Sequence, residues 1–168
     1  ISTAEVAVRA AILPASQVAR AITTDNIGGG FIYAVGSNYS GQHWVVDKLS
    51  ISDGSSQPGF PIVWRSGYSF DPNSITIPPA GATAPAPYYF YVLGTGTDGT
   101  EHYRRIEKRW TVNGALCDNN ISCDSVFGSS GAVTVGPAYS SAIVSATSGI
   151  YIASHDDKSE GTLGWGAP

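Results

Sequence analysis

Tyr88-Tyr-Phe-Tyr-Val-Leu93 begins the stretch that decides the fold. A glycine-rich segment follows it, Gly94-Thr-Gly-Thr-Asp-Gly99, and then a second long run, His102-Tyr-Arg-Arg-Ile-Glu-Lys-Arg-Trp-Thr-Val112. The aromatic and β-branched residues of both runs are typical of strands. A glycine-rich connection that contains Asp-Gly is typical of a hairpin turn. The stretch therefore predicts an antiparallel β-hairpin.

Shorter runs of the same kind lie on both sides of this hairpin. They are bounded by Gly, Ser, Asn and Asp clusters and occupy residues 31–35, 44–51, 60–64, 132–135, 142–145 and 150–153. Turn signals spaced about 8–12 residues apart favour an antiparallel sandwich or barrel over alternating strands and helices. We expect a single domain over residues 1–168, with an antiparallel sheet or β-sandwich over 31–153 and a polar tail over 154–168.

The first 25 residues predict the only helix. Ser2-Thr-Ala-Glu5 matches a capping box, and alanine is frequent after it. Pro14 should kink the helix or begin a second one. An apolar stripe on this segment would be the candidate assembly surface, made of Val8, Ile12, Val18 and Ile22. The expected fold class is thus mainly β with one N-terminal helix (α+β).

Cys117 and Cys123 are the only cysteines, and the residues between them are mostly polar and suited to turns. Zinc requires four ligands, and the chain has no CxxC motif or histidine-rich partner. The pair is therefore interpreted as a local disulfide that closes one loop. Such a bond indicates an oxidising compartment, so we expect an extracellular or cell-surface protein.

Composition excludes several function classes. The net charge is −4, which argues against a nucleic acid partner, because phosphate binding requires a surplus of positive charge. The longest apolar stretch, residues 4–22, is interrupted by Arg9, Pro14 and Arg20 and is not expected to span a membrane. No nucleophile–base motif, metal-ligand spacing or phosphate loop is recognisable. We expect no enzymatic activity, no metal and no cofactor.

The candidate ligand or partner surface consists of basic and aromatic side chains, namely Arg104, Arg105, Arg109, Trp44 and Tyr89. On a strand, Arg105, Glu107 and Arg109 would share one face. They could form a cationic strip for an anionic ligand, or a solvated face with cross-strand ion pairs. The second interpretation is preferred, because Glu101 and Glu107 offset half of the charge. For the aromatic residues, core packing is likewise preferred over a binding platform.

Two family resemblances complete the interpretation. A capped helix, a glycine-rich loop at Gly28-Gly29-Gly30, an antiparallel sheet and a disulfide-closed loop, in that order, resemble the globular domain of type IV pilins and pseudopilins. Residues 2–22 would then correspond to the exposed half of the long pilin helix. Separately, Ala34-Val-Gly-Ser-Asn-Tyr-Ser-Gly-Gln-His-Trp44 after an amphipathic helix is similar to the early part of actinoporin-type cytolysins, which insert such a helix into membranes.

The pilin resemblance implies a non-enzymatic extracellular subunit, structural or adhesive, of a pilus-like surface filament. Its partners would be further copies of itself or other extracellular subunits, and possible ligands include glycans. The alternative is a secreted binding module, either carbohydrate-binding or membrane-directed in the manner of a cytolysin.

Overall fold

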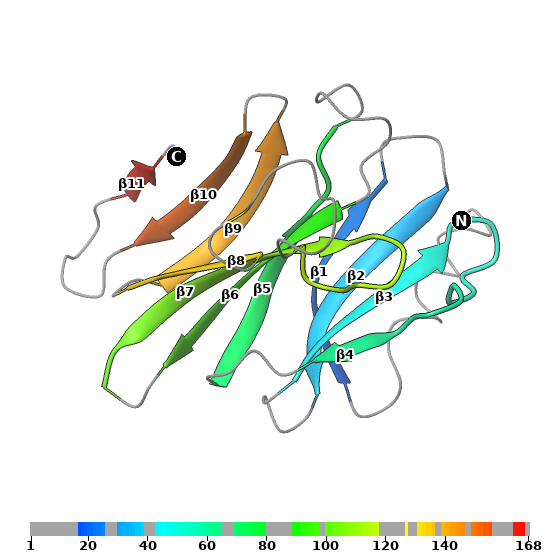
Figure 1. Cartoon of the computed structure of the whole chain (residues 1–168), viewed down its shortest axis with the longest axis horizontal. Coiled ribbons are helices and arrows are strands. Elements are labelled where there is room, and N and C mark those ends of the chain that lie inside the picture. The colour runs from blue at the N-terminus through cyan, green and yellow to red at the C-terminus, as the bar shows by residue number, and fades with distance from the viewer. Residues whose placement is uncertain are drawn as a thin grey trace.

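The computed structural model describes residues 17–25, 30–38, 43–64, 69–79, 89–97, 100–117, 127, 131–136, 139–146, 149–155 and 163–166. Within these residues the regular structure is entirely β. The strands form three antiparallel sheets, which Figure 1 shows next to one another, with the sheet of β5 to β8 in the middle.

The first sheet contains β1 (Gln17–Thr24), β2 (Phe31–Asn38), β3 (Trp44–Ser50) and β4 (Ile62–Trp64), in that order. Neighbouring strands are antiparallel and consecutive in sequence, so the sheet is a simple meander. As a result β1 and β4 form its two edges.

The central sheet contains β5 (Ser69–Thr76), β6 (Tyr89–Thr97), β7 (His102–Trp110) and β8 (Ala132–Val135), again in sequence order. The β6–β7 pair is the predicted hairpin, with a continuous register from Tyr89 opposite Trp110 to Thr97 opposite His102. The third sheet has the order β11 (Leu163–Gly166), β10 (Gly149–His155) and β9 (Tyr139–Ala146).

The central sheet is covered on both faces. Phe90 and Val92 of β6 belong to a core cluster with Tyr33, Val35, Trp44 and Val46 of the first sheet. Leu93, the next residue of β6, belongs to a second cluster with Ile106 and Ile143, and Ile143 lies on β9. Successive side chains of a strand point to opposite faces. The described strands therefore form three β layers, and β6 and β7 lie in the middle one.

The helix predicted over residues 1–25 is wrong for the part that the structure describes. Residues 17–24 form the strand β1. Val18 and Ile22 are four residues apart, a spacing that places both on one side of a helix. In β1 a register shift interrupts the alternation of side chains, and the two residues lie opposite Ser37 and Ala34, on different faces of the sheet. Val8 and Ile12 lie outside the described residues.

Two further strands were not expected. β5 contains Pro72, a residue that normally argues against a strand. It is tolerated because β5 is an edge strand of the central sheet and its pairing with β6 is irregular between Pro72 and Ser74. β11 lies in the segment that was predicted to be a polar tail, and it extends the third sheet beyond β10. Among the described residues, no helix is long and apolar enough to cross a membrane.

Candidate functional site

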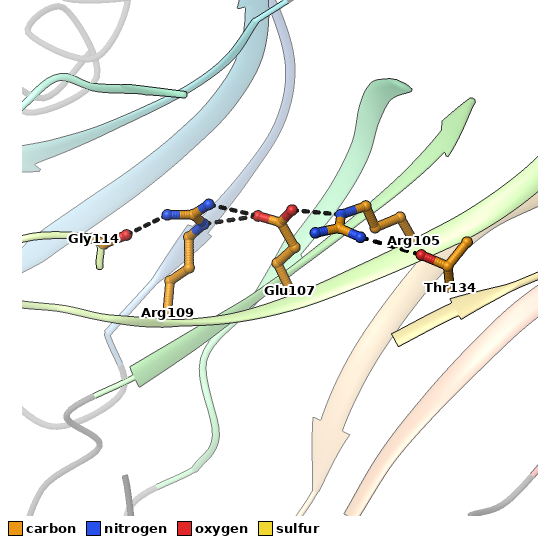
Figure 2. Close-up of polar contacts among 5 residues, drawn as sticks. All are labelled: Arg105, Glu107, Arg109, Gly114 and Thr134. Atoms are coloured by element: carbon orange, nitrogen blue, oxygen red, sulfur yellow. Dashed lines mark hydrogen bonds and ion pairs between the residues drawn. The ribbon is translucent and has the colours of Figure 1, made fainter. Parts of the chain in front are cut away.

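A network of charged side chains occupies one face of β7. The carboxylate of Glu107 lies between two guanidinium groups (Figure 2). Its Oε1 accepts a hydrogen bond from Arg105 Nε at 2.6 Å, and its Oε2 accepts one from Arg109 Nε at 2.8 Å. Arg109 Nη2 is also 2.8 Å from Oε2. The alternation of a strand produces this arrangement, because residues 105, 107 and 109 share one face.

This network is buried. The side chains of Glu107 and Arg109 are 1% and 8% exposed, whereas that of Arg105 is 24% exposed. Glu107 and Arg109 lie opposite the core residues Val92 and Phe90 of β6, so they point toward the first sheet. Burial lowers the pKa of Arg109, and the charge and hydrogen bond of Glu107 oppose this shift.

Arg109 also joins β7 to the first sheet. Its guanidinium carbon lies 3.9 Å from the ring centroid of Trp64 on β4, and its Nη1 donates a 2.6 Å hydrogen bond to the carbonyl of Gly114. Arg105 Nη1 donates to Thr134 on β8 at 3.2 Å. The network thus connects β4, β7, β8 and the turn after β7.

The preference for ion pairs at these residues agrees with these contacts, but the expectation of a solvated face is wrong. The ion pairs run along β7 rather than across strands. Glu107 and Arg109 are buried because the first sheet covers this part of the face, and Arg105 remains partly exposed.

The remaining basic residues of β7 point the other way. Lys108 is 1% exposed, and its ammonium lies 3.9 Å from the ring centroid of Tyr89 on β6. Arg104, which is partly buried, occupies an even-numbered position of β7, as Lys108 does. The predicted partner surface of Arg104, Arg105, Arg109 and Tyr89 is therefore divided between the two faces of the central sheet.

Trp44 does not contribute to a binding surface either. Its side chain is 0% exposed and belongs to the first core cluster. The indole packs on the backbone of Gly94 in β6, where any Cβ atom would overlap its ring. Trp44 also contacts Trp64, with ring centroids 5.7 Å apart. The preference for core packing holds for this residue.

Cys117 is buried, 1% exposed, and is not a free cysteine. Its amide donates to the carbonyl of Lys108 at 2.9 Å, which places it beside β7. Cys123 lies outside the described residues, so the Cys117–Cys123 disulfide stays a prediction.

β1 forms one edge of the first sheet, and it also lies close to β5 of the central sheet. Among the described strands, β1 pairs only with β2, and this pairing is irregular between Ala19 and Ala21. Ala21 packs against the first core cluster, whereas Ile22 points away and is 53% exposed. Val18 is 38% exposed, and Arg20 is also exposed. Two of the four predicted assembly residues therefore lie on an accessible edge strand.

A surface hollow of about 490 Å³ lies where β2 begins and β3 ends. It is lined by Gly30, Phe31, Ser50, Ile51, Ser52, Asp53, Ser55 and Gln57. None of these residues was predicted as a site. The sequence signal was a cluster of Ser, Asp and Gly after a strand, which indicates a turn but not a ligand.

Within the described part of the chain, no three His, Cys, Asp or Glu side chains gather closely enough to hold a metal ion. Compared with models of protein families, with curated proteins and with solved structures, the chain matches none of them.

Proposed function

We propose that this chain is a non-enzymatic extracellular structural or adhesive subunit, and that copies of it associate through β1. The observation that carries the proposal is the state of β1, an eight-residue edge strand with two large apolar side chains exposed. An edge strand presents unpaired backbone donors and acceptors, to which a strand of another chain can pair.

The distribution of charge along β1 favours its second half, residues 21–24, as the surface of contact between copies. Arg20 lies at the irregularity in the β1–β2 pairing, and both features hinder further pairing there. Residues 21–24 follow this irregularity, carry no charge and include Ile22. The occupant proposed for this half is the β1 strand of a second copy.

The free energy available for association through β1 is moderate. About half of the Ile22 side chain remains accessible, and burying it would contribute about 1 kcal/mol per copy. The new backbone hydrogen bonds would contribute about 0.5–1.5 kcal/mol each. Association of this strength would be reversible, and pairing through β1 in both copies would give a two-fold dimer.

Sedimentation velocity over a range of protein concentrations tests the proposal. The wild-type chain should associate, and Ile22→Lys should shift the equilibrium toward monomer, since a lysine on an edge strand opposes pairing. Val144→Lys is the matched control, because Val144 is 58% exposed on β9 of the third sheet. A wild-type chain that stays monomeric, or equal effects of the two substitutions, would refute assembly through β1.

A further inference from the structure

We propose that the hollow between β2 and the turn after β3 is a binding site for a neutral saccharide. Its lining includes no residue of β1, so it can succeed or fail independently of the assembly proposed above. The turn consists of residues 51–57, all of them described.

The shape of the hollow is suited to a small ligand. Its volume of about 490 Å³ lies within the range of roughly 300–1,000 Å³ that is usual for small-molecule sites. Gly30 forms part of its wall with a φ of +68°, and a Cβ atom placed there would meet nothing within 4 Å. The backbone at this position therefore faces open space rather than packed side chains.

The polar groups around the hollow are held in place by one another. Ser50 Oγ and Ser52 Oγ are 2.8 Å apart. Asp53 Oδ1 accepts hydrogen bonds from the amide of Ser55 at 3.0 Å and from its hydroxyl at 2.8 Å. The amide of Gly54 donates to the carbonyl of Ser50 at 2.8 Å. Preorganised groups lose little conformational entropy when a ligand binds.

The chemistry of these groups matches sugar hydroxyls. Serine hydroxyls both donate and accept, the Gln57 carboxamide does the same, and an ionised carboxylate is a strong acceptor. Hydrogen bonds from Ser55 lower the pKa of Asp53 and thus favour its ionised form. Ile51 adds apolar surface, on which the C–H face of a sugar ring can pack, whereas the Phe31 ring is already engaged by the ammonium of Lys48, 4.2 Å from its centroid.

The charge of the lining distinguishes between classes of saccharide. Among the described residues that line the hollow, Asp53 is the only charged one, and it is negative. A sulfated or sialylated glycan would be repelled by it, and the neighbouring ammonium of Lys48 is already engaged with the rings of Phe31 and Tyr33. One carboxylate with hydroxyl neighbours also provides too little charge for a stable calcium site, which normally takes several carboxylate or carbonyl oxygens. A neutral saccharide carries no charge for Asp53 to repel and needs no metal ion, so it is the ligand class that suits this lining.

Isothermal titration calorimetry with maltotriose, cellotriose, chitotriose and lactose, and with heparin as an anionic probe, tests this assignment. At least one neutral probe should bind saturably, and heparin should not. Asp53→Asn should weaken the binding of that probe by about tenfold, because it removes a charge-assisted hydrogen bond. Glu101→Gln, which neutralises an exposed acidic residue beside the β6–β7 turn, should leave the affinity within about twofold.

The assignment is overturned if none of the neutral probes binds, if heparin binds better than they do, or if the two substitutions have equal effects. Asp53→Asn should sediment like the wild-type chain, and Ile22→Lys should still bind the probe. These two controls separate a failure of the saccharide site from a failure of assembly.

Discussion

Replacing Glu107 by Gln should destabilise the protein more than any other single change of charge on β7. The carboxylate is 1% exposed and holds both Arg105 and Arg109, of which Arg109 is itself only 8% exposed. Removing one partner of a buried ion pair leaves the other charge desolvated and costs about 3–5 kcal/mol. Because Arg109 would retain its hydrogen bond to Gly114 and its contact with Trp64, we expect a loss of about 3 kcal/mol.

The matched control is Arg105→Ala on the same strand. The Arg105 side chain is 24% exposed, so solvent screens its charge and the loss should be about 1 kcal/mol. Urea unfolding, followed by circular dichroism and tryptophan fluorescence, measures both values. With a total stability of about 5–15 kcal/mol expected for a domain of this kind, the two losses are easily distinguished.

The double variant Glu107→Met with Arg109→Met tests whether a buried, unpaired charge causes the loss of stability. If the cost of Glu107→Gln comes from an uncompensated buried charge, removing both charges should cost less than the sum of the two single methionine variants. Additive losses of stability, or a Glu107→Gln variant no less stable than Arg105→Ala, would show that Glu107 and Arg109 do not stabilise each other as a buried ion pair.

Three further predictions follow from single positions. Gly114→Ala should cost about 1–3 kcal/mol more than Gly30→Ala in urea unfolding, because both glycines have a φ near +67° but only at Gly114 would a Cβ overlap a side chain, that of Ile62. Burial raises the pKa of Asp47, so the carboxyl group binds a proton more readily in the folded protein than in the unfolded one, and its contribution to the free energy of unfolding should fall as the pH rises from the ordinary aspartate pKa through the raised value. Asp47→Asn, which can still accept a hydrogen bond from Ser56, should abolish this part of the pH dependence of stability. Mass spectrometry of the unreduced protein should find Cys117 bonded to Cys123, and two free thiols would remove the argument for an oxidising compartment.

The elements with unambiguous local signals were predictable from sequence. The β6–β7 hairpin follows from two aromatic and β-branched runs around a glycine-rich turn, and β8 occupies the expected residues 132–135. β1 was not predictable, since alanine-rich sequence with apolar residues four apart satisfies a helix and a strand equally. β5 was hidden by Pro72, which only its place at a sheet edge makes acceptable.

The burial of β7 could not be predicted from its own residues. A run with Arg104, Arg105, Glu107, Lys108 and Arg109 has the composition of a solvated strand. It is buried because one sheet covers each face, and that layering depends on contacts between segments far apart in the chain. The hollow proposed to bind a saccharide could not be predicted from local sequence either, because its wall brings Phe31 and Ser50 together through the register of β2 and β3.

Hydrogen exchange at increasing protein concentration tests assembly through β1 most directly. The account predicts that amides of residues 21–24 become more protected as concentration rises, while those of β4, the opposite edge of the same sheet, do not change. Protection of β1 that is independent of concentration, or that increases at β4 instead, would contradict it.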